Sequence, residues 1–90
     1  MNRAKLNIRT DLFRVAKTAF NIKKQFEYEI AQEFIEKAKL ELDRIPVESA
    51  TLKNDLVSYQ AEMNTIQNDP LKRIRWGEKI ITISTRLGIV

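Results

Sequence analysis

The chain has 90 residues, which is enough for one small domain. It contains no cysteine and no histidine, which excludes disulfides, thiolate metal sites and histidine-based catalysis. Hydrophobic residues make up 43% and charged residues 31%, a balance typical of a folded protein. Two glycines and two prolines leave few turns, so the composition predicts an all-α fold.

The net charge of +4 is unevenly distributed. Residues 1–24 hold seven basic and one acidic residue, residues 25–69 hold four basic and ten acidic, and residues 70–90 hold five basic and one acidic. Two basic segments therefore flank an acidic middle. If the two basic segments pack together, they concentrate positive potential, whereas packing of the last segment on the middle would neutralise it.

The first predicted element is a long helix over approximately residues 11–45. Apolar residues recur there every three or four positions, and neither proline nor glycine interrupts them. Thr10 is a favourable N-cap, and Asn21 is the weakest point of the pattern. Residues 1–9 are expected to form a basic N-terminal arm, ahead of a single helical domain over residues 10–90.

Pro46 ends this helix, and Ser49 offers the N-cap of a second helix over residues 49–67. Five apolar residues follow with a heptad-like spacing that suits packing along one partner helix: Leu52, Leu56, Tyr59, Met63 and Ile66. The short link predicts an antiparallel hairpin of the first two helices.

A third, shorter helix is predicted over residues 70–87. Asp69 is a preferred N-cap and Pro70 is favoured at the first helical position. The run of β-branched residues from Ile80 to Thr85 leaves a strand over residues 79–85 as the alternative. Gly88 suits the position after a helix end.

The apolar face of the long helix exceeds what one shorter partner covers, so we expect a small helical bundle that oligomerises or docks on another protein. The interface is predicted at Phe13, Ala16, Phe20, Phe26, Ile30 and Phe34.

The basic segments have two interpretations. They are contacts to phosphates or to an acidic partner, or they are solvated helix faces with Trp76 in the core rather than stacked on a base. The residues concerned are Arg14, Lys17, Lys23, Lys24, Lys72, Arg73, Arg75 and Lys79.

No catalytic constellation, phosphate-binding loop or nucleic-acid-binding motif occurs in the sequence. Glu29, Glu33 and Glu36 have a spacing that can bind metals in bundles, but they flank the apolar stripe and are expected to face water. We therefore expect no enzyme activity, no cofactor and no metal. We do not expect contact with a membrane. We expect the protein to be cytoplasmic.

Two functional hypotheses follow. The first is a non-enzymatic interaction protein, such as an assembly subunit, an adaptor or a virus-type inhibitor, that binds itself or a larger protein with an acidic surface. The alternative is a basic protein that contacts the phosphates of nucleic acid without sequence specificity.

Overall fold

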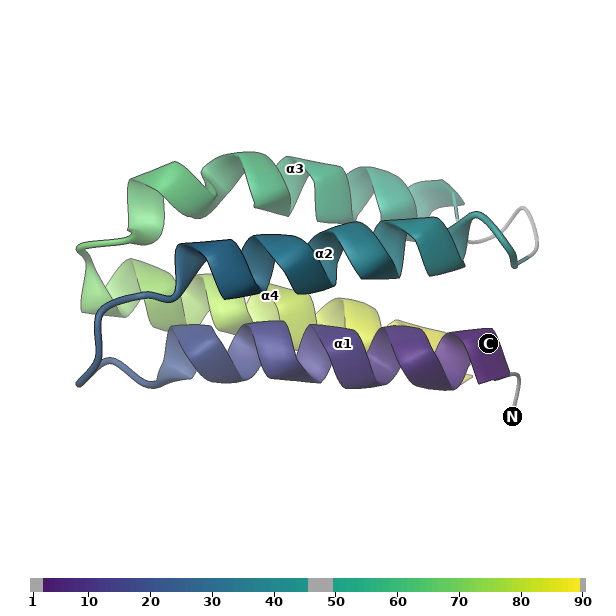
Figure 1. Ribbon diagram of the computed structural model, residues 1–90, viewed down its shortest axis with the longest axis horizontal. Coiled ribbons are helices and arrows are strands. Elements are labelled where there is room, and N and C mark those ends of the chain that lie inside the picture. Colours follow the sequence, from purple (N-terminus) through teal and green to yellow (C-terminus); the bar gives the residue numbers. More distant parts are fainter. Residues whose placement is uncertain (1–2, 46–49, 90) are drawn as a thin grey trace.

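Four α-helices form an antiparallel bundle: α1 (Arg3–Phe20), α2 (Tyr28–Leu42), α3 (Ala50–Ile66) and α4 (Pro70–Ile89) (Figure 1). The computed structural model describes residues 3–45 and 50–89. Each helix runs against the next, and α4 returns to pack on α1, which is the up-down-up-down arrangement of four-helix bundles. The described residues include no strand, so the all-α prediction is confirmed, with four helices instead of three.

The predicted helix over residues 11–45 is wrong, because the chain reverses between Phe20 and Tyr28. Asn21 lies in the reversal, where its carbonyl oxygen accepts a hydrogen bond from the Lys24 N–H at 3.1 Å. A continuous helix over this range would extend about 50 Å, whereas the bundle is 36 Å along its longest axis. Folding the segment back buries both halves of its apolar stripe against each other and against the other helices.

The buried stripe also changes phase at the reversal. Before it, α1 buries Ile8, Leu12, Val15, Ala16 and Ala19. After it, α2 buries Ala31, Ile35, Ala38 and Leu42. Residues 3–9, expected in an arm, are the first turns of α1, and Ile8 belongs to the core.

The seam predicted for the second helix is confirmed in α3. Leu52, Leu56, Met63 and Ile66 are buried, and the half-buried Tyr59 packs against them. The antiparallel hairpin is also present, but its first arm is α2 alone. Pro46 and Ser49 lie outside the described residues.

The start of α4 agrees with its predicted capping. A carboxylate oxygen of Asp69 accepts a hydrogen bond from the backbone N–H of Lys72 at 3.1 Å, and Pro70 is the first helical residue. The β-branched run is helical, so the strand alternative is wrong. Trp76 is only 1% exposed, and its indole N–H donates to the Tyr59 carbonyl oxygen at 2.8 Å, which ties α4 to α3.

Candidate docking surface

A buried arginine binds the backbone of the reversal that connects α1 to α2. Arg73, on α4, is 4% exposed. Its guanidinium donates to the carbonyl oxygens of Thr18 and Asn21 at 3.0 Å each and of Lys24 at 2.8 Å. These oxygens belong to the end of α1 and the following turn, where a helix has no partners of its own for its last carbonyls. Arg73, which was predicted to contact phosphates or an acidic partner, is thus buried and bonded within the fold.

Aromatic packing closes the same end of the bundle. The buried ring of Phe26 meets Trp76 edge to face, with ring centroids 5.7 Å apart, and Arg73 lies over Phe26 at 5.5 Å from the ring centroid. Phe26 was predicted to contact a partner, but it is a core residue. The same correction applies to Ala16, which is fully buried in α1.

Three large apolar residues remain in contact with solvent on α1. Leu6, Phe13 and Phe20 are 51%, 59% and 40% exposed and follow one another at intervals of seven residues. That interval keeps side chains on nearly one line of a helix, with a drift of about 20° per step. We call these three residues the apolar row.

α4 borders the apolar row and sets part of its shape. A β-carbon placed on Gly77 would lie 2.6 Å from Cε1 of Phe20, so the glycine makes room for that ring. Further along α1, a groove of about 450 Å³ is lined by Leu6 and Phe13, the basic residues Arg14 and Lys17, and Ser84 of α4. The apolar row is therefore accessible and has cations beside it.

The remaining predicted interface residues lie on α2. Ile30 is exposed, whereas Phe34 is half-buried. The Phe34 ring lies beneath two cations, with Arg14 at 5.3 Å and Lys37 at 5.1 Å from its centroid. Of the six predicted interface residues, the structure therefore exposes Phe13, Phe20 and Ile30.

Charge divides the bundle into two layers. α1 and α4, which are neighbours, together hold ten basic and two acidic residues, a formal charge of +8. α2 and α3 together hold three basic and six acidic residues, a formal charge of −3. The arrangement that concentrates positive potential is thus the one adopted.

Only some of the basic residues form ion pairs with acidic residues. Lys79 pairs with Glu62 at 3.4 Å and Arg86 with Asp55 at 3.5 Å, both between α4 and α3. Four further basic residues pair with acids on or beside α2, namely Lys37, Lys39, Arg44 and Lys53.

Seven exposed basic residues, Arg3 and Arg14 among them, have no ion pair within the described part of the chain. Five of the seven lie in the last turn of α1, in the reversal after it or in the first two turns of α4. They are Lys17, Lys23, Lys24, Lys72 and Arg75, and we call them the basic end. The bonds of Arg73 join the start of α4 to the turn after α1, and these two segments lie at the same end of the bundle (Figure 1). The sequence prediction included all five, together with three residues that the structure engages elsewhere, namely Arg14, Arg73 and Lys79.

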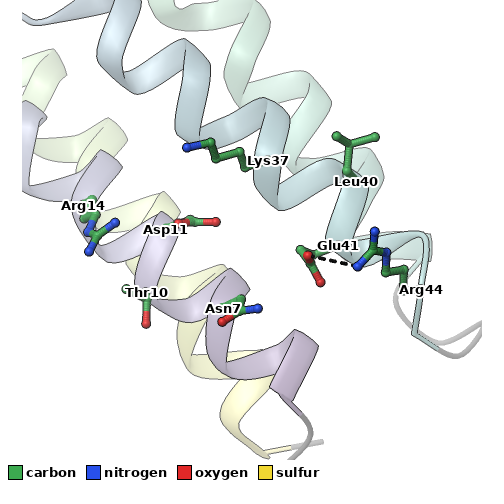
Figure 2. A pocket seen from close by; sticks show the side chains of 8 residues that line it. All are labelled: Asn7, Thr10, Asp11, Arg14, Lys37, Leu40, Glu41 and Arg44. Carbon is green, nitrogen blue, oxygen red and sulfur yellow. Dashed lines mark hydrogen bonds and ion pairs between the residues drawn. The ribbon is translucent and has the colours of Figure 1, made fainter.

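A polar pocket of about 380 Å³ lies between α1 and α2 (Figure 2). Asp11 and Arg14 line it from α1, opposite Lys37 and Glu41 of α2. Burial raises the pKa of the Asp11 carboxyl above its usual value; Lys37 and Arg14 oppose this shift, and Glu41 adds to it. The lining carries both signs of charge, from Asp11 and Glu41 and from Arg14, Lys37 and Arg44.

Within residues 3–45 and 50–89, no three side chains of metal-binding type converge on one point, and Glu29, Glu33 and Glu36 face solvent. None of the helices described is long and apolar enough to cross a membrane. Comparisons with protein-family models, curated proteins and solved structures found no match for this chain.

Proposed function

We propose that this protein is a non-enzymatic docking module whose α1 surface holds another protein through the apolar row. The observation that carries this proposal is the exposure of Leu6, Phe13 and Phe20 on one line of one helix. Single exposed apolar residues are normal, but an aligned set with a basic border is typical of an interaction site.

The test compares retained partners across matched variants. Leu6 and Phe13 are substituted together by serine, and Leu40→Ser serves as the control, because Leu40 is 65% exposed on α2 and lies outside the apolar row. We expect the protein and its control to retain the same partners from a lysate of the source cells, or to self-associate equally in light scattering. The Leu6→Ser/Phe13→Ser variant should lose them while keeping its helical circular dichroism. Equal retention by all three proteins would refute the proposal.

A second candidate function is contact with the phosphates of nucleic acid, favoured by the unpaired charges of the basic end. Burial of Trp76 and Arg73 removes the residue proposed to stack on a base and one of the cations proposed to meet phosphates. The five remaining cations predict binding that weakens linearly in log salt, without sequence preference.

Fluorescence anisotropy with a mixed-sequence DNA or RNA fragment tests this second candidate. Lys72→Glu combined with Arg75→Glu should weaken binding and reduce its salt dependence, because both side chains are exposed. Arg73 must be left intact, since its reversal would disrupt the fold. Binding that these reversals leave unchanged would exclude the basic end as a phosphate site.

A further inference from the structure

We infer that the apolar row receives an amphipathic helix with acidic flanks, supplied by a partner protein. This inference rests on the proposed function and specifies the partner's chemistry. Three observations carry it: the interval of the row, the charge of its borders and the charge of the layer to which it belongs.

The interval of seven residues matches a helical occupant. Side chains that repeat every seven residues form the seam of two helices packed at a small angle. From Leu6 to Phe20 the row spans about 21 Å at 1.5 Å per residue. A helix of about 14 residues, or four turns, covers that length and presents apolar side chains at the matching interval.

The charge beside the row selects the flanks of that helix. Among residues 3–45 and 50–89, neither Lys17 nor Arg14 forms an ion pair, and Arg14 lies over the Phe34 ring. Both line the groove that contains Leu6 and Phe13. Carboxylates along one side of the bound helix would pair with Arg14 and Lys17. This pairing favours the orientation in which the apolar side chains of the bound helix contact the apolar row.

The layer charge argues against a second copy in the same place. A two-fold symmetric contact through the apolar row would set the +8 layer of α1 and α4 against an identical layer. Like charges brought together across an interface are unfavourable. A duplex nucleic acid would satisfy the cations but offers phosphates and sugars, and not an apolar seam, to Leu6 and Phe13.

The probes are two amidated peptides of 15 residues with leucine at each a and d position of the heptad. One carries glutamate at every flanking position and the other carries lysine. Binding is followed by amide chemical shifts of the intact protein, which detect weak complexes. We expect the acidic peptide to shift resonances along residues 6–20 and to bind at least about tenfold more tightly than the basic peptide.

Variants connect the binding to the row. Phe13→Ser should abolish the chemical-shift changes. Lys17→Glu should weaken binding of the acidic peptide and strengthen binding of the basic peptide. Leu40→Ser should leave the binding of both peptides unchanged. Equal binding of both peptides, or shifts located on α2 and α3, would overturn the inference.

The inference and the proposed function can fail separately. If neither peptide binds, yet partners or self-association are lost on substituting Leu6 and Phe13, the row is a docking site for something other than an acidic helix. If the peptides fail and those substitutions also change nothing in the partner assay, the docking function itself is refuted. Shifts of the apolar row with anionic vesicles or a DNA fragment, but not with the acidic peptide, would likewise overturn the inference.

Discussion

The guanidinium of Arg73 takes the place of water at the end of α1, where three carbonyl oxygens converge on it. A cation at a helix C-terminus also interacts favourably with the helix dipole. The side chain is therefore a tertiary cap, supplied by α4 to a reversal that has neither glycine nor proline. Without this cap, the carbonyls of Thr18 and Lys24 would lose these bonds next to the buried Phe26 and Trp76, and Asn21 would keep only the bond from the Lys24 N–H.

Replacement of Arg73 by methionine should cost about 2–4 kcal/mol of unfolding free energy, because several hydrogen bonds to a charged group are lost together. Arg75→Met is the matched control, since Arg75 lies two residues away, is exposed and has no ion pair among the described residues. The control should change stability by no more than about 0.5 kcal/mol. Urea denaturation measures both, and similar costs for the two variants would contradict the capping role.

The role of Arg73 was detectable in the sequence in part. Arg73, Trp76, Ile80, Ile83 and Leu87 step by three or four residues, so the arginine shares the stripe that is buried. Its apolar neighbour Ile74, which lies one position off this stripe, is only half-buried. The hydrogen-bond acceptors of Arg73 could not be predicted from the sequence, because they are three backbone carbonyl oxygens and every residue has one.

At the scale of the elements, the pairing of α1 with α2 creates an unusual environment for one carboxyl. Burial raises the pKa of Asp11, so its protonated form is favoured more in the folded than in the unfolded chain. Its contribution to stability is therefore complete below the unfolded pKa and is lost as pH rises through the folded pKa. At neutral pH the ionised carboxyl lowers stability.

Asp11→Asn should accordingly raise the thermal unfolding midpoint at about pH 7, and the difference from the parent should disappear at about pH 3. The contrasting variant is Glu36→Gln on α2. Hydrogen bonds from Gln60 and Lys39 lower the pKa of Glu36, so its contribution is present above the unfolded pKa and is lost as pH falls through the lowered folded pKa. Glu36→Gln should lower the midpoint at neutral pH. The same sign for both variants would contradict this assignment.

Helix type, the seam of α3 and the start of α4 could be predicted from the sequence, whereas the division between α1 and α2 could not, and α4 continues through Gly88 to Ile89 instead of ending before it. Capping by Asp69 and Pro70 is local, and so is the seam of α3. The reversal after Phe20 is a tertiary effect: no residue there forbids a helix, and the packing of two short helices outweighs the continuation of one. The same effect explains why Phe26 and Ala16 are core residues, while Phe13 and Phe20 remain exposed.

At the scale of the whole molecule, the chain order of the charges becomes a division in space. The sequence shows basic ends and an acidic middle, but only the return of α4 to α1 makes them opposite layers of the bundle. In general, a layer of one charge sign speeds association with molecules of the opposite sign. The layer of α1 and α4 also carries a cost in self-repulsion, which is largest where cations lie near the start of α4 and lack acidic partners.

That cost gives a prediction for the intact fold. Lys72 and Arg75 lie in the first two turns of α4, where the helix dipole disfavours positive charge, and neither has an ion pair among the described residues. Their joint replacement by glutamine should raise the unfolding free energy by about 0.5–1 kcal/mol at low salt. The gain should shrink at about 0.5 M salt, because exposed charges are screened there.

The same helix supplies the control. Lys79 and Arg86 undergo the same change of charge on substitution by glutamine, but each is paired with an acid of α3. Their joint replacement should leave stability unchanged or lower it by up to about 1 kcal/mol at low salt. Urea denaturation at two salt concentrations compares the pairs. If both double variants gain stability equally, net charge alone governs the fold, and the unpaired state of Lys72 and Arg75 has no separate energetic cost. If only the Lys72 and Arg75 variant gains, the fold tolerates an unfavourable basic end, which is the pattern expected where charge is kept for binding rather than for stability.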